Sequence, residues 1–259
     1  MKFFQVSSFT DYCFGGNPAG VCLLYNDWLS DEILQKIAMQ INLSETVFVL
    51  DKGGELFIRW FTPTIEVDLC GHATLAAAHI LFGSLKVDLL VFKSKHYTLP
   101  VKKQDDMIVL DFPMANISML NITDVPDCFN RKPNEAWMGH DEYMLIFDNE
   151  AAVKNAVCDM QAAKNISKSG FIITATSDES GIDFVSRYFA PKIGINEDPV
   201  TGSAHTLLVP YWQRIMGKNK FRARQVSKRG GELFLKADGD RVKIGGKAVT
   251  FLMGEVCAL

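Results

Sequence analysis

Two segments of the chain are apolar over the length of a helix and have almost no polar face. The first extends from Thr74 to Phe82, and the second extends from Ala204 to Met216, with His205, Gln213 and Arg214 as its strongly polar positions. A helix without a polar face has to be buried on all sides. The pattern therefore predicts two central helices, each surrounded by strands.

Glycine and proline are expected to shape these two helices. Gly83 should end the first and Gly217 the second, because glycine accepts the left-handed backbone that follows many helices. Pro210 lies inside the second segment and lacks the N–H that a helix interior requires. It predicts a kink or a break near residues 206–207.

Shorter patterns predict strands and a further helix. The β-branched runs at residues 21–24 and 47–50 are typical of strands. Ser30, followed by two acidic residues and by apolar residues at helical spacing up to Ile41, is typical of a helix start. Further on, residues 233–237 and 242–244 alternate around Asp238-Gly239, which indicates a β-hairpin.

The same order of features occurs twice along the chain. An aromatic strand with an Arg and a Pro, an acidic loop, a glycine (Gly71 or Gly202) and an apolar helix follow one another in both halves. Copies about 130 residues apart indicate two similar domains, since the repeats of a solenoid recur every ~20–50 residues. We assign residues 1–115 to an N-terminal domain and residues 116–259 to a C-terminal domain. The last ~10 residues are candidates to join the N-terminal domain.

The composition is that of an ordinary globular protein. Of the 259 residues, 48% are hydrophobic and 22% are charged, and the formal net charge is -3. This charge gives no electrostatic reason to expect nucleic acid, and no apolar stretch is long enough for a signal peptide or a membrane span. The six cysteines are scattered, which predicts reduced thiols. We therefore expect a cytoplasmic protein that binds neither nucleic acid nor membrane.

Four stretches concentrate glycine, carboxylate and other polar residues: 15–20, 42–46, 68–72 and 197–203. Each has a simpler interpretation when it is taken alone. Gly-Asn-Pro is usually a turn, and Glu45 by itself is more often a solvated carboxylate than a catalyst. His72 could be a helix cap or a core histidine, and Asp198 before a proline could start a turn.

The repeat changes this balance. If Gly71 and Gly202 each open a central helix, the two helix N-termini can point at a shared interface, where backbone N–H groups and helix dipoles favour an anion. Glu45 and Asp198 beside these loops would be partly desolvated, which raises the pKa of a carboxyl group toward the range useful for proton transfer. These features predict a carboxylate-binding site between the domains.

Together these stretches resemble one known family. Residues 9–19, 42–46, 61–74 and 197–204 are similar in order and spacing to the PhzF-like (phenazine biosynthesis) family, and the resemblance covers nearly the whole chain. Residues 224–231 follow the family only loosely, with Val226 where a glycine is usual. The resemblance implies an α+β fold like that of diaminopimelate epimerase. In this fold two pseudo-symmetric domains, each a β-barrel around a central helix, enclose an active site in the cleft between them.

The resemblance also implies a mechanism. Glu45 would take a proton from a substrate carbon and a proton would return elsewhere on the molecule, with His72 and Asp198 as the other catalytic residues. The residues implied to bind the substrate are Asn17, Ser44, Gly71, Ala73, Thr201, Gly202 and Ser203. A small carboxylate is expected as the substrate and a homodimer as the assembly, and no metal, flavin or pyridoxal phosphate is implied.

Two other functions stay open. Cys70 stands where epimerases of this fold carry one of two catalytic thiols, and a thiol beside a helix N-terminus can act as a base. Because the 197–204 loop has no second thiol, we expect Cys70 to be a buried spectator rather than the base of an amino-acid racemase. The last hypothesis is a binding or scaffold protein without turnover. A protein that had lost its activity would be expected to lose some of the site residues, but this chain keeps Glu45, His72, Asp198 and Ser203.

Overall fold

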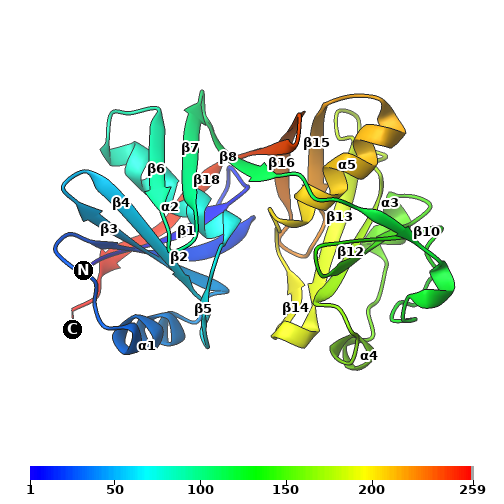
Figure 1. Cartoon of the computed structure of the whole chain (residues 1–259), viewed down its shortest axis with the longest axis horizontal. Helices are drawn as coiled ribbons and strands as arrows, with labels where there is room; N and C mark the ends of the chain where they lie inside the picture. The colour runs from blue at the N-terminus through cyan, green and yellow to red at the C-terminus, as the bar shows by residue number, and fades with distance from the viewer. Residues whose placement is uncertain (258–259) are drawn as a thin grey trace. The chain divides into compact units, whose positions relative to one another are not determined.

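A computed structural model describes residues 1–257, and the chain divides into two compact units. The first unit contains Met1–Asp111 and the segment that starts at Gly245, and the second contains Phe112–Ile244. The chain leaves the first unit within strand β8 (Met107–Pro113) and returns to it within strand β17 (Arg241–Gly246). Each unit combines helices with strands, which confirms the predicted α+β class (Figure 1).

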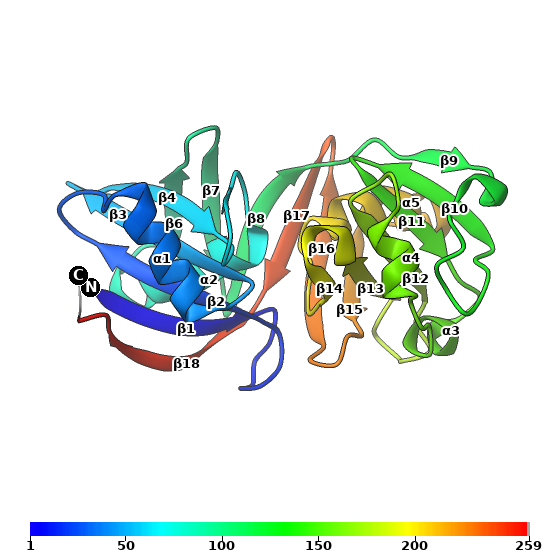
Figure 2. The same cartoon turned by 90° about the horizontal axis from the view of Figure 1, so that it is seen from below.

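The first unit is a sheet with one helix inside it and one helix outside it. Its other strands are β1 (Lys2–Ser8), β2 (Asn17–Leu24), β3 (Glu45–Lys52), β4 (Glu55–Phe61), β5 (Glu66–Val67), β6 (Leu89–Lys93), β7 (Thr98–Gln104) and β18 (Ala248–Glu255), and its helices are α1 (Asp31–Ile41) and α2 (Gly71–Ser84). β1 pairs antiparallel with both β2 and β18, which run beside it in Figure 2. The pairs β2/β3 and β4/β6 are parallel, and α1 and α2 are their respective crossover helices.

The second unit repeats this order of strands and helices. Its strands are β9 (Ser118–Leu120), β10 (Glu135–Gly139), β11 (Glu142–Ile146), β12 (Gly170–Thr176), β13 (Phe184–Ala190), β14 (Ile195–Asp198), β15 (Lys220–Gln225) and β16 (Gly231–Asp238). Its helices are α3 (Glu150–Lys154), α4 (Met160–Lys164) and α5 (Ala204–Met216), with short 3-10 helices at Ile122–Asp124 and Pro191–Ile193. The parallel pairs are β11/β12, across α3 and α4, and β13/β15, across α5.

A matching ion pair marks the same point of the repeat in both units. Arg59 on β4 donates through Nε and Nη2 to the two carboxylate oxygens of Glu66 at 2.7 and 2.8 Å. Arg187 on β13 donates in the same way to Glu197 at 2.7 and 3.0 Å. Gly71 and Gly202 each follow five residues after the paired glutamate. The sequence repeat thus corresponds to a repeat of local contacts, each of which fixes the short strand before the central helix.

Helix α2 is buried along most of its length, as its apolar composition predicts, and packs against β1, β2, β3 and β18. It extends one residue beyond Gly83 to Ser84, because the Leu85 N–H still bonds to the Leu81 carbonyl at 2.7 Å. The predicted stop at Gly83 is therefore wrong by a residue. An exposed glycine inside the last turn costs a helix only about 1 kcal/mol, which the buried turns before it can offset.

Helix α5 is continuous through Pro210, so the predicted break near residues 206–207 is wrong. Proline leaves the carbonyl four residues before it, that of Thr206, without its helical donor. The Ala115 N–H donates to this carbonyl at 3.2 Å and takes the place of the lost bond. The helix ends at Gly217 in the left-handed conformation, with φ 62°, as predicted.

The remaining helices cover outer faces of the sheets. The Ser30 hydroxyl caps α1 by accepting the Ile33 N–H at 3.4 Å, which confirms the predicted start. Leu34 and Ile37 of α1 pack with strand residues such as Phe48, and α1 lies outside the sheet (Figure 1). In the second unit, α3 and α4 contribute to the equivalent cluster. Among residues 1–257, no helix has both the length and the apolar character that crossing a bilayer requires.

Candidate active site

Glu45 is the first residue of β3 and its position follows from the end of α1. The helix closes at Asn42, which adopts the left-handed conformation (φ 54°) and bonds its N–H to the Ala38 carbonyl. Three residues later β3 begins and pairs parallel with β2, where Ala19 lies opposite Glu45. The Glu45 side chain is only 13% exposed. The short connection from α1 to β3 therefore holds this carboxylate where it is largely shielded from solvent.

His72 lies in the first turn of α2 and faces Glu45. Its Nε2 is 3.3 Å from Glu45 Oε2 and 3.4 Å from Ser44 Oγ. The Ser8 hydroxyl donates to the His72 carbonyl at 2.7 Å, which ties the helix start to the end of β1. The neighbouring residues Ser44 and Glu45 are thus brought together with His72, which lies 28 positions after Ser44, within the first unit.

Cys70 lies on the other side of the same imidazole ring. Its Sγ is 3.4 Å from His72 Nδ1, and the residue is 8% exposed. The Thr74 hydroxyl donates to the Cys70 carbonyl at 2.6 Å and itself accepts the Trp60 indole N–H at 3.1 Å. The expectation of a buried Cys70 is confirmed, whereas its contact with a site histidine was not anticipated from the sequence.

The burial of Glu45 changes its acid strength. Desolvation raises the pKa of this carboxyl group above its usual value, and the hydrogen bond with Ser44 opposes part of that rise. A raised pKa brings a glutamate closer to the neutral range, where a group that both accepts and returns a proton works best. The direction is the one expected for Glu45 from the sequence.

Asn17 and its glycine-rich turn support the same site. Asn17 is fully buried at the start of β2, and Ser44 Oγ lies 3.4 Å from Asn17 Oδ1 and 3.4 Å from the Pro18 carbonyl. Gly16 has φ 62°, and a Cβ there would come within 2.2 Å of the Ser8 carbonyl oxygen. Glycine is therefore required at this turn, which lies next to Asn17.

Gly71 and Ala73 contribute backbone rather than side chains. Helix α2 starts at Gly71, as the sequence predicts, and Ala73 is fully buried. The first N–H groups of an α-helix have no partner within the helix and carry the positive end of its dipole. Any contribution of Gly71 and Ala73 to ligand binding would come from these amides.

In the second unit, Asp198 is the last residue of β14 and is 7% exposed. The Thr201 hydroxyl donates to Asp198 Oδ2. The side chain of Gln225 holds both: its Nε2 donates to the Asp198 carbonyl at 2.8 Å and to Thr201 Oγ1 at 3.1 Å, and its Oε1 accepts the Thr201 N–H at 2.8 Å. Gln225 is fully buried. Hydrogen bonds from Thr201 and Gln225 thus hold both the side chain and the backbone of Asp198.

Gly202 and Ser203 differ slightly from the prediction. Helix α5 begins at Ala204, not at Gly202, and the two residues before it form a tighter turn. The His205 N–H bonds to the Gly202 carbonyl and the Thr206 N–H to the Ser203 carbonyl, both at 3.0 Å. Gly202 is buried, whereas Ser203 is exposed.

Sequence reasoning missed Ser8 and Gln225, which hold His72 and Asp198 in place. Both are polar residues in strands, Ser8 in β1 and Gln225 in β15. The sole signal for Gln225 was its position in residues 224–231, a region with a loose resemblance to the family. A buried glutamine between alternating strand residues is a signal that could have been used, because a buried amide has to be hydrogen-bonded.

A metal ion does not fit the first unit's cluster in its present arrangement. Glu45, Cys70 and His72 each offer a ligand atom, and these atoms lie within 4.8 Å of one another. The thiol, however, faces Nδ1 and the carboxylate faces Nε2. One ion can bind only one nitrogen of an imidazole, so the two other ligands would have to approach from the same side of the ring.

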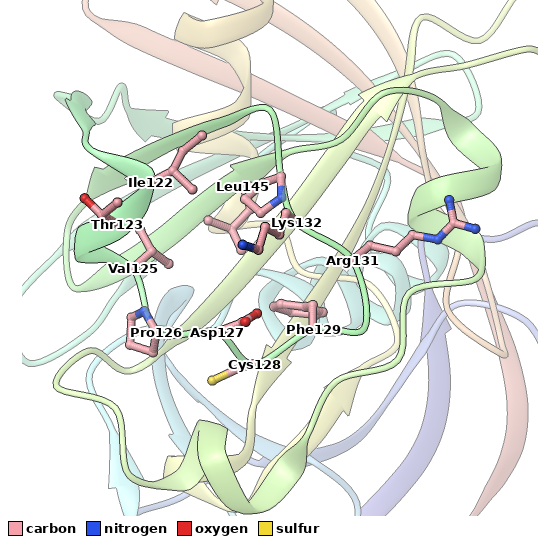
Figure 3. Close-up of a pocket in the computed structure, with 11 residues that line it drawn as sticks. Ile122, Thr123, Val125, Pro126, Asp127, Cys128, Phe129, Arg131, Lys132 and Leu145 are labelled. Carbon is pink, nitrogen blue, oxygen red and sulfur yellow. The ribbon is translucent and has the colours of Figure 1, made fainter.

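A pocket of about 210 Å³ lies elsewhere in the second unit (Figure 3). It is lined by residues between Ile122 and Pro133 and by Leu145 of β11. None of the predicted site residues lines it. Its walls are mainly apolar and carry Arg131 and Lys132, both exposed. This pocket is separate from the Asp198 loop, and we assign no function to it.

Comparisons with known proteins agree with the geometry. Residues 6–254 match the family model PhzC-PhzF, described as phenazine biosynthesis-like protein. The chain is 42% identical to an uncharacterized isomerase of Pseudomonas aeruginosa, over 99% of this chain and 98% of that one. A crystal structure of a PhzF-family phenazine biosynthesis protein from Enterococcus faecalis superposes with a TM-score of 0.94 at 40% identity, over 99% of both chains.

A more distant structure shares the fold alone. A probable proline racemase from Agrobacterium radiobacter superposes with a TM-score of 0.62 at 11% identity, over 99% of this chain and 92% of the racemase. The expected fold, common to PhzF proteins and racemases of the diaminopimelate-epimerase type, is thereby confirmed.

Proposed function

Since the chain belongs to the phenazine biosynthesis-like PhzC-PhzF family, in which similar proteins are named isomerases, we propose that it moves a proton on a small carboxylate-bearing substrate with Glu45 as the acid/base group. Glu45 removes a proton from one carbon and the proton returns to another carbon, so that a double bond changes its place. Atoms and electrons balance without an oxidant, a reductant or a second substrate.

The observation that carries this proposal is the environment of the Glu45 carboxylate, its burial and its contact with His72. The carboxylate is 13% exposed, its pKa is raised by burial, and its Oε2 lies 3.3 Å from His72 Nε2. A base for a carbon acid needs a pKa near the working pH and a fixed orientation. Burial supports the first requirement, and contacts with His72 and Ser44 support the second.

The substrate carboxylate requires a cationic or N–H-rich partner. The first turn of α2, with Gly71 and Ala73, supplies backbone N–H groups and the positive end of a 14-residue helix. We propose that these amides bind the anion beside Glu45. In the second unit, we propose Asp198 as a further catalytic residue and Thr201, Gly202 and Ser203 as substrate-binding residues, as the family resemblance implies.

The competing proposal of an amino-acid racemase that uses Cys70 has less support. Cys70 directly precedes Gly71, and the residue that directly precedes Gly202 in the second repeat is Thr201. A hydroxyl cannot replace the second thiol as a base, because its pKa is far above that of a thiol. A racemase of this kind would therefore have to pair Cys70 with a base other than a second thiol at the equivalent position of the repeat.

Glu45→Gln tests the proposal, because it keeps the size of the side chain and removes the proton acceptor. A panel of small unsaturated and 2-amino carboxylates is incubated in D2O, and deuterium incorporation at carbon is followed by proton NMR. We expect exchange by the native protein and a loss of about 100-fold or more in the variant, the usual contribution of a general base.

Glu32→Gln is the matched control. It changes an exposed glutamate of α1 in the same unit and should leave exchange unaltered. Undiminished exchange in a folded Glu45→Gln protein would exclude Glu45 as the proton-transferring group. Binding of a carboxylate in calorimetry without any exchange across the panel would instead favour the binding-protein hypothesis.

A further inference from the structure

The imidazole of His72 lies between a thiol at one ring nitrogen and a carboxylate at the other. Cys70 Sγ lies 3.4 Å from Nδ1, and Glu45 Oε2 lies 3.3 Å from Nε2. Cys70 and His72 are 8% and 6% exposed. The three side chains therefore form a short chain of polar contacts, thiol to imidazole to carboxylate, that is largely closed to solvent.

The carboxylate decides which ring nitrogen carries the proton. An ionised carboxylate only accepts hydrogen bonds, so its approach to Nε2 requires an N–H there. In a neutral imidazole the other nitrogen, Nδ1, is then an acceptor. A thiol is a weak donor, and Cys70 is placed to donate its S–H to this atom. Thiol and carboxylate thus favour the same tautomer of His72.

We propose that Cys70 is a positioning residue, whose thiol donates to His72 Nδ1 and holds the ring as the Nε2–H tautomer that faces Glu45. This inference rests on the proposed function of Glu45. Cys70 takes no proton from the substrate. It acts through His72, whose Nε2–H donates to Glu45 and in turn orients the carboxylate.

The second unit supports the same reading of this position. Thr201 precedes Gly202, the glycine at the equivalent point of the sequence repeat, and donates its hydroxyl to Asp198 Oδ2. In both repeats, therefore, the side chain before this glycine contacts a polar group of a predicted site residue. The structure records no side-chain cap bond for Cys70 at the start of α2.

Nitrogen NMR of the native protein tests the inference without a substrate. The ring nitrogens of His72, assigned with a His72→Gln sample, report directly which of them is protonated. Above neutral pH we expect a protonated Nε2 and an unprotonated Nδ1. A protonated Nδ1 in the native protein would overturn the inference, and this result does not depend on whether any variant folds.

Cys70→Ala supplies the second measurement. Loss of the thiol donor should shift His72 toward a mixture of tautomers, and proton exchange on substrate should fall about tenfold through kcat with little change in KM, a fraction of a full acid/base contribution. The matched control is Cys22→Ala, which removes another buried thiol of the same unit from an apolar cluster. It should change neither the tautomer nor the exchange rate.

The two levels of the proposal fail differently. If Glu45→Gln abolishes exchange while Cys70→Ala leaves both tautomer and rate as in the native protein, the role of Cys70 is wrong and that of Glu45 stands. If Glu45→Gln has no effect on exchange, the proposed function is wrong, although the nitrogen spectra still decide whether Cys70 holds the ring of His72.

Discussion

The side-chain amide of Gln225 donates to the backbone carbonyl of Asp198 at 2.8 Å. The two residues are 27 positions apart, and the same amide group also donates to and accepts from Thr201. Gln225 is fully buried, so none of these bonds can be replaced by water without a rearrangement. The amide from β15 therefore contributes directly to the orientation of the Asp198 loop.

Gln225→Glu should destabilise the protein by about 2–4 kcal/mol. The variant keeps the size and the acceptor oxygen, but it loses both donated bonds and places a buried carboxylate against the Asp198 carbonyl. Urea denaturation followed by fluorescence measures the difference. Gln104→Glu, at an exposed position of β7, is the control and should change stability by less than about 0.5 kcal/mol. Equal stability of the two variants would contradict the assigned role of Gln225.

The central helices and their repeat are predictable because they depend on local patterns. An all-apolar segment such as the one around Leu75 has only one stable place, the interior. The prediction that Glu45 is partly desolvated is confirmed, because the helix-to-strand connection that buries it is short in sequence. The order of strand, acidic loop, glycine and helix was also sufficient to locate Asp198.

What could not be predicted depends on contacts between distant segments. The sequence shows that Cys70 precedes a helix, but not that His72 presents Nδ1 to the thiol and Nε2 to Glu45. In the same way, Pro210 predicts a broken helix when only the local sequence is considered. The N–H of Ala115, which donates to the Thr206 carbonyl and compensates for the missing helical bond, lies 91 residues before Thr206. These outcomes follow from packing, which a local pattern does not encode.

Thr74→Val should destabilise the protein by about 1–3 kcal/mol. The hydroxyl of Thr74 accepts the Trp60 indole N–H at 3.1 Å and donates to the Cys70 carbonyl at 2.6 Å. Valine has nearly the same shape but leaves the buried indole N–H without its acceptor, which costs the desolvation of that group. The free energy of unfolding, obtained from urea denaturation, checks this value.

Thr46→Val is the matched control in the same unit. Thr46 is fully buried, and its hydroxyl has no hydrogen-bond partner within the part of the chain that the structure describes. Removing an unsatisfied buried hydroxyl is expected to be neutral or stabilising. A loss of stability at Thr46 equal to the loss at Thr74 would show that shape, rather than hydrogen bonding, determines both results.

Glu45→Gln should stabilise the fold increasingly as the pH rises. Burial raises the pKa of Glu45 in the folded protein above its value in the unfolded chain. Between these two values the folded state binds more protons than the unfolded state, so the native protein loses stability as the pH rises through this window. The Glu45→Gln variant has no titrating group at this position and therefore does not lose stability in this window. The difference in Tm between variant and native protein should be smallest near pH 4 and increase toward neutral pH.

Glu32→Gln gives the opposite sign in this experiment. Its hydrogen bond with Lys36 lowers the pKa of the Glu32 carboxyl group, so its contribution to stability is present at neutral pH and is lost as the pH falls. The Glu32 variant should therefore be equally stable or slightly less stable than the native protein at neutral pH. A Glu45 variant that follows the same pH trend as the Glu32 variant would contradict the assigned burial of Glu45.

Arg187→Lys should cost more stability than Arg59→Lys, although the two arginines make the same bidentate pair in the two repeats. Arg187 also donates through Nη1 to the carbonyls of Val153 at 3.1 Å and Ala156 at 2.8 Å. Its side chain is 13% exposed and that of Glu197 is 24% exposed, against 19% and 40% for Arg59 and Glu66. Lysine cannot reproduce a planar fork or reach the carbonyls at the same time.

We expect a loss of about 2–3 kcal/mol for Arg187→Lys and about 1 kcal/mol or less for Arg59→Lys in urea denaturation, because the more exposed pair is better screened by water. The Arg187 variant should also reduce proton exchange on substrate, since Glu197 directly precedes Asp198 and its pairing with Arg187 fixes the strand that carries that carboxylate. Equal losses in the two variants would mean that the carbonyl contacts of Arg187 contribute no more than the additional ion pair of Arg59 with the exposed Asp31 at 2.9 Å. An unchanged exchange rate in a destabilised Arg187 variant would show that Gln225 alone is sufficient to hold Asp198.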